Sequence, residues 1–228
     1  MPYTYQEITK ADTDAGTTYS MIMEECIVRL HSIQMLLLTP RTMRPSLVRE
    51  YGYLQLRFCC ELVALACLIA HGDIKATQTK QLSKAYVPGE ILRRLTELHP
   101  DFYPVRVKIT VRPSVGPGDP GEVHLGDFEK KYLDKAKLIA LWGKCGNFLH
   151  KGSLRRLQRV NENHRSNIKL DDLVSDAQLM LNLFESHRIS RKGNLFHFLA
   201  YMKIVDWNTE HASISPQVWT LHSRTQSS

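Results

Sequence analysis

The stretch of residues 46–72, SLVREYGYLQLRFCCELVALACLIAHG, restricts the fold more than any other part of the chain. Large apolar side chains recur in it at steps of three and four, the period of an α-helix, and they are Leu47, Tyr51, Leu54, Phe58, Leu62, Leu65 and Ile69. From Phe58 onward the opposite face is apolar or small as well, with Cys59, Cys60, Val63, Ala64, Ala66, Cys67 and Ala70. A helix that is apolar all round is buried on all sides, so we expect a central core helix. Ser46 is the expected N-cap and Gly72 the expected C-terminal stop.

The segments around the central helix predict further helices. Residues 17–38 repeat the helical period, with Thr17 or Thr18 as the cap and Pro40 beyond the end. The short connection to the central helix predicts an antiparallel pair. Other apolar stripes predict helices over residues 88–98, from 127 to about 149, and from about 170 to 187.

Two parts of the chain predict β structure instead. Over residues 105–112 apolar and polar side chains alternate, which indicates a half-exposed strand with a basic outer face, and residues 123–125 are its expected return strand. A second aromatic, β-leaning element lies near 195–221. Because isolated hairpins are marginally stable, we expect the two elements to pair against one side of the bundle. The predicted class is mainly α (α+β), an antiparallel helical bundle with β elements near 104–125 and 195–221. A flexible arm (1–16), one domain (17–222) and a disordered tail (223–228) complete the predicted organisation.

The composition of the chain limits the classes of binding partner but does not identify one. The formal net charge of +7 permits an acidic partner such as RNA, DNA or anionic lipid, and it is equally consistent with a solvated basic surface. Five cysteines without a disulfide framework, no secretory signal, and an apolar run broken by Glu61 indicate a cytoplasmic protein that does not enter a membrane.

The segment 141–153, LWGKCGNFLHKGS, is the strongest candidate for chemistry. Lys144, Asn147 and His150 are spaced to share one face of a helix end. A cation, an amide and an imidazole together can bind a phosphate and move a proton. The alternative is structural, with Asn147 and His150 capping the helix end.

A helix that carries this asparagine and continues into His-x-Gly resembles the HEPN superfamily of small helical domains, over roughly residues 17–187. The resemblance implies long antiparallel helices and, in many members, RNA cleavage in toxin–antitoxin and phage-defence systems. The family signature is an arginine, four to six residues, then a histidine. Here Lys144 holds the arginine position with five residues before His150, and lysine lacks the planar fork that grips a phosphate with two bonds. Some members act only as binding or assembly modules.

Other basic residues extend this candidate site. Arg57 and Glu61 are four apart on the central helix, which predicts a structural ion pair or, alternatively, an arginine that replaces the missing motif residue. A basic run directly follows His150 and consists of Lys151, Arg155, Arg156 and Arg159. It is spaced for backbone contacts to nucleic acid or for a solvated surface.

No pattern of metal ligands or cofactor binding occurs in the sequence, so we expect neither. Three functions remain open. The first is an RNA-associated HEPN-like protein that is either a weakened metal-independent endoribonuclease or an inactive one. The second is a non-catalytic interaction module that dimerises through its helices, with its protein partner unidentified. The third is a small-molecule binding protein with its ligand between helices and sheet.

Overall fold

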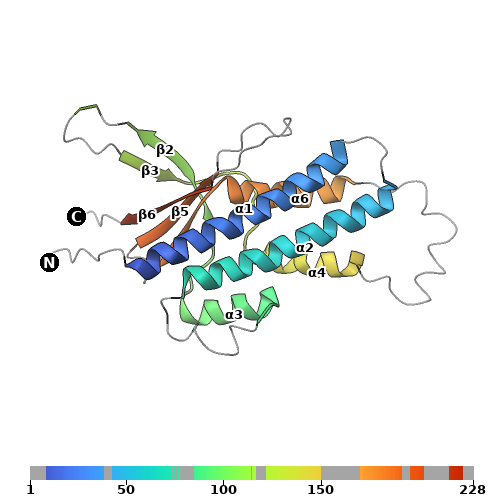
Figure 1. Cartoon of the computed structure of the whole chain (residues 1–228), viewed down its shortest axis with the longest axis horizontal. Coiled ribbons are helices and arrows are strands. Elements are labelled where there is room, and N and C mark those ends of the chain that lie inside the picture. The colour runs from blue at the N-terminus through green and yellow to red at the C-terminus, as the bar shows by residue number, and fades with distance from the viewer. Residues whose placement is uncertain are drawn as a thin grey trace.

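The computed structural model describes residues 9–38, 43–72, 74, 77, 85–113, 115–116, 122–149, 170–191, 196–202 and 216–222 (Figure 1). The described helices are α1 (Lys10–Leu38), α2 (Pro45–Ala70), α3 (Pro88–Leu98), α4 (Lys135–Leu149) and α6 (Asp171–Glu185). The described strands are β1 (Val105–Arg106), β2 (Lys108–Arg112), β3 (Glu122–Gly126), β4 (Ser186–Arg191), β5 (Phe196–Met202) and β6 (Pro216–His222). A mainly helical fold with small antiparallel sheets confirms the predicted fold class.

The long helices α1 and α2 run antiparallel, and α4 and α6 pack along them (Figure 1). Their shared core is built from α1 side chains such as Tyr19 and Ile27, the inner face of α2, and Leu173, Met180 and Phe184 of α6. The antiparallel pairing predicted from the short connection is therefore present. Helix α3 covers the C-terminal half of α2 with Ile91, Leu92 and Leu95, all of which are buried (Figure 1).

The face of α2 that is buried is not the one that its largest side chains mark. Fully buried positions are mostly small, and they include Gly52, Cys59, Cys60, Ala64, Ala66, Cys67 and Ala70. The stripe of large residues is only partly covered, and Leu47 and Phe58 keep 46% and 37% of their surface exposed. The expectation that α2 is buried on all sides was wrong, because small side chains let neighbouring helices approach closely on one face only.

The ends of α1 and α2 also differ from expectation. Helix α2 begins at Pro45 and has Arg44 at its N-cap without a side-chain hydrogen bond, so Ser46 is not the cap. Helix α1 begins at Lys10, so residues 10–16 are helical and do not belong to a loose arm. Its cap is a reciprocal pair: the Asp12 backbone N–H donates to Thr9 Oγ1 (3.2 Å), and the Thr9 N–H donates to Asp12 Oδ2 (3.0 Å). The rest of the predicted arm, residues 1–8, and the predicted tail lie outside the described residues.

Helix α4 begins at Lys135, eight residues later than predicted. Asp134 fixes this start, because its Oδ1 accepts a hydrogen bond from the Lys137 backbone N–H (2.8 Å). Burial acts to raise the pKa of the Asp134 carboxyl, but hydrogen bonds from Lys137 outweigh it and hold the pKa below its usual value.

Both predicted β elements are present, and they are joined through a strand that the sequence did not reveal. Strands pair antiparallel in the order β1-β4-β5-β6, and β2 and β3 form a separate hairpin from Lys108↔Gly126 to Arg112↔Glu122. Helix α6 ends at Glu185, and residues predicted as its last turn and exit form β4. The predicted pairing of the two β elements thus runs through β1 and β4 only.

The strand alternation is inverted at β1. Val105 is 41% exposed, whereas Arg106 is buried, contrary to its predicted place on a basic outer face. Its guanidinium donates to the Ser186 carbonyl (2.8 Å), forms an ion pair with Glu185 (2.5 Å), and lies 4.0 Å from the centre of the Phe128 ring. These partners compensate the buried charge, while the Arg106 Nε is buried without a hydrogen-bond partner among the described residues.

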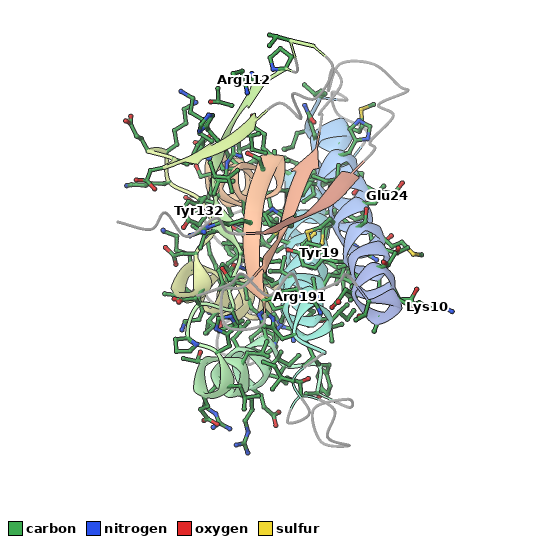
Figure 2. All side chains as sticks on the ribbon, turned by 90° about the vertical axis from the view of Figure 1, so that its left-hand side faces the viewer. Lys10, Tyr19, Glu24, Arg112, Tyr132 and Arg191 are labelled. Carbon is green, nitrogen blue, oxygen red and sulfur yellow. The ribbon has the colours of Figure 1, made fainter. Side chains whose placement is uncertain are left out.

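Among the buried polar contacts that join the sheet to the helices are one of Tyr19 and one of Arg191, both labelled in Figure 2. The Arg191 guanidinium pairs with Asp12 at 2.9 Å, with both side chains 2% exposed, and also donates to the carbonyl of Ala70. This contact ties β4 to the start of α1 and the end of α2.

The second contact is a neutral hydrogen-bonded chain. His187 Nδ1 lies 3.0 Å from the Leu183 carbonyl, which can only accept, so Nδ1 carries the proton and Nε2 accepts from the Tyr19 hydroxyl at 2.7 Å. Burial lowers the pKa of His187 to about 4 and raises the pKa of Tyr19.

We predict that Gly52→Ala destabilises the protein by about 1–3 kcal/mol, because overpacking a filled core costs this much. A Cβ at Gly52 would lie 2.4 Å from Leu173 Cδ2, between α2 and α6. Gly143→Ala, in α4 with open space around it, should instead stabilise by about 0.5–1 kcal/mol. Urea unfolding of both variants checks this. Equal effects, or no relief of the Gly52→Ala cost in Leu173→Ala background, would contradict the contact.

We predict that His187 makes stability fall as the pH drops from about 6.5 to about 4. In this window the unfolded histidine, with its pKa of 6.5, binds a proton that the folded one at about 4 excludes, so stability rises with pH by a total of about 3 kcal/mol. His187→Asn should flatten this slope relative to the parent. An NMR titration of the parent that places the His187 ring near pH 6.5 would contradict the assignment.

Candidate functional site

The predicted site falls on α4, where Lys144 faces α6. Its Nζ lies 2.6 Å from Asp176 Oδ2, and the Tyr53 hydroxyl donates to the same oxygen at 3.2 Å. The side chains of Lys144 and Asp176 are 37% and 16% exposed, so solvent reaches the lysine side chain more easily than the aspartate side chain. Asp176 Oδ2 therefore forms an ion pair with a lysine of α4 and accepts a hydrogen bond from a tyrosine of α2.

Aromatic packing holds this cluster in place. The Tyr53 and Phe148 rings stack 4.0 Å apart at 6°, which fixes α2 against the last turn of α4. The Lys144 ammonium lies 5.6 Å from the centre of the Tyr53 ring, and the Arg49 guanidinium lies 5.0 Å from that of Phe148. Each ring of the stacked pair thus has a cation beside it, Lys144 at Tyr53 and Arg49 at Phe148.

Electrostatics keep Lys144 charged. Burial acts to lower the pKa of Lys144, but its hydrogen bond and attraction to Asp176 and its contact with Tyr53 outweigh burial and raise it. Burial and the Asp176 charge raise the pKa of Tyr53 to about 12. Lys144 is therefore a protonated anion-binding group near neutral pH and cannot serve as a base.

Arg57 lies along another side of α4. Its Nε is 3.2 Å from Glu61 Oε1, its guanidinium lies 4.4 Å from the centre of the Trp142 ring, and the Trp142 indole N–H donates to Glu61 at 3.0 Å. The predicted Arg57–Glu61 ion pair is confirmed. A Cβ at Gly146 would lie 3.3 Å from Arg57 Nη1, so the guanidinium also touches the α4 backbone.

The described residues include only part of the predicted site. Lys144 and Asn147 are both on α4, with Asn147 exposed. Trp142 and Lys144 are two residues apart, about 200° around a helix. Arg57 therefore lies against one flank of α4, at Trp142, while Lys144 projects from the opposite flank. His150, Lys151, Arg155, Arg156 and Arg159 lie outside the described residues, and so does their geometry. His150 follows Gly146 by four positions in the sequence.

Sequence reasoning missed the partners that define this cluster, namely Asp176, Tyr53, Trp142 and Phe148. Asp176 is 32 positions from Lys144 and 123 from Tyr53. No local spacing connects residues so far apart, and the only signal was an acidic residue beside the apolar face of α6.

A groove of about 390 Å³ lies elsewhere, between α1 and α6. Its lining includes Leu30, Ile33 and Leu37 of α1 and Val174, Ala177 and Leu181 of α6. The groove is open and lies between two helices, whereas the predicted small-molecule site was expected between helices and sheet.

Two general properties bear on the class of site. Within the described ranges, no group of three or more His, Cys, Asp or Glu side chains could hold a metal ion. By length and composition alone, α2 could cross a bilayer, a test that the core helix of a globular fold also passes, and half of its most apolar stretch is buried here.

Comparison with known protein families, with curated proteins and with solved structures found no match to this chain.

Proposed function

We propose that this protein is an RNA-associated, HEPN-like helical protein that binds the RNA backbone along α4 and the basic segment after it. The observation that carries the proposal is the fixed Arg57 guanidinium. It is oriented by Trp142 and Glu61 and lies against α4 at Gly146, four residues before His150. A preorganised guanidinium suits phosphate, because less side-chain freedom is lost on binding.

The distribution of basic residues also supports RNA binding along α4. The chain carries a net charge of +7, and four basic residues (Lys151, Arg155, Arg156 and Arg159) follow α4 directly in the sequence. The described part adds Arg57 on one flank of α4 and Arg49 and Lys144 on the opposite flank, so bound RNA would meet basic side chains on both sides of this helix. Such a cluster attracts a polyanion at a distance and releases counterions on contact.

Binding is favoured over cleavage as the primary activity. In the role that the resemblance implies, His150 is the acid or base, while Lys144 and Asn147 hold phosphate. Lys144 is already paired with Asp176, so the family's arginine is replaced here by a charged lysine that a carboxylate compensates. We accordingly propose association with cytoplasmic RNA, with nuclease activity as a separate, testable addition.

We predict that the protein binds a single-stranded RNA oligonucleotide with an affinity that falls steeply with salt. Arg57→Gln should weaken binding by about threefold to tenfold and lower the slope of log K against log salt by about one, the signature of one lost phosphate contact. The control is Arg93→Gln on α3, because Arg93 also forms an ion pair with a glutamate four residues on. Fluorescence anisotropy measures both. Equal behaviour of the two variants, or binding without salt dependence, would refute the proposal.

The same samples test for cleavage. Parent and His150→Ala proteins are incubated with RNA side by side in chelator, since the implied nuclease needs no metal. Under the association proposal RNA stays intact with both proteins while both bind it. Cleavage by the parent that disappears in His150→Ala would instead assign a nuclease.

A second candidate function is protein interaction, including dimerisation through the helices. It is favoured by apolar side chains left exposed on α2 (Leu47, 46%; Phe58, 37%) and on α1 (Met21, 64%; Val28, 53%). Analytical ultracentrifugation tests it directly. A stable dimer that has no RNA affinity and separates in Phe58→Asp would establish this function in place of the first.

A further inference from the structure

We infer that Asp176 is a built-in competitor for RNA phosphate at Lys144, and that it limits how tightly the α4 surface holds RNA. The inference rests on the proposed RNA binding and assigns a regulatory residue to that surface. It starts from the ion pair between Lys144 Nζ and Asp176 Oδ2, at 2.6 Å.

The geometry leaves this cation open to exchange. The Lys144 side chain is 37% exposed and that of Asp176 is 16% exposed, so a phosphate in solution has more access to the lysine than to the aspartate. Partly exposed ion pairs contribute little net stability, because solvation and side-chain freedom offset their attraction. Exchanging Asp176 for phosphate is therefore not opposed by a strong native contact.

Tyr53 keeps the carboxylate at the site. Its hydroxyl donates to the same Asp176 oxygen at 3.2 Å, and its ring is buried and stacked on Phe148. This hydrogen bond favours the present position of Asp176, where its charge repels a phosphate at close range. Removing the Asp176 charge should remove both the competition and the repulsion.

The chain offers a matched control on the same helix. Asp172 lies one turn before Asp176 on α6, is exposed, and has no ion-pair partner among the residues that the structure describes. Asp176→Asn and Asp172→Asn make the same change in net charge. Only the first frees Lys144.

The experiment measures RNA affinity by anisotropy at several salt concentrations for the parent, Asp176→Asn and Asp172→Asn. We expect Asp176→Asn to bind about threefold to tenfold tighter, with a slope in log salt steeper by about one, and Asp172→Asn to change affinity less than about twofold. Adding Lys144→Met to Asp176→Asn should abolish the gain. Tyr53→Phe, which leaves the charge but loosens its hold, should give a smaller gain and serves as a second route if Asp176→Asn unfolds.

The outcomes separate the two proposals. If the parent binds RNA but Asp176→Asn and Asp172→Asn behave alike, or the gain survives Lys144→Met, Asp176 is not a competitor and the binding proposal stands. If no protein in the set shows salt-dependent binding, RNA association itself is wrong, and this inference is wrong with it.

Discussion

The close approach of α1 and α4 to the small-residue face of α2 is the contact on which the other features depend. Gly, Ala and Cys side chains on that face allow short distances between helix axes, and their larger neighbours fill the space at its edges. Because α2 is held on that face, Tyr53 and Arg57 meet opposite flanks of α4. The candidate site is therefore a product of core packing rather than of a flexible loop.

Buried polar contacts position the sheet against the helices, and the loss of one partner from such a contact would lower the stability of the protein. Removing one member of a buried ion pair such as Arg191–Asp12 typically costs about 3–5 kcal/mol, since it strands the other charge. Together with the Tyr19–His187 chain, this pair fixes β4, which continues directly from α6. The position of Asp176 beside Lys144 thus depends partly on contacts at the far end of the same helix.

The periodicity of apolar residues was enough to predict the helices and both β elements. It failed where the same sequence pattern was compatible with two different structures. From Phe58 onward both faces of the central helix are apolar or small, so the sequence could not tell which one is buried. The polar sequence SHRISR resembles a loop, yet backbone pairing and buried partners make it strand β4. Lys144 and Asn147 were correctly placed on a helix, whereas Asp176 and Tyr53 join them only through tertiary packing.

The cysteines of this fold have a practical consequence. All five are free and buried, and burial raises the pKa of Cys26, Cys60, Cys67 and Cys145, the last to about 12. A thiol that is both shielded and protonated hardly reacts with alkylating reagents. The rate at which these four thiols are labelled therefore reports how often the helices around α2 separate.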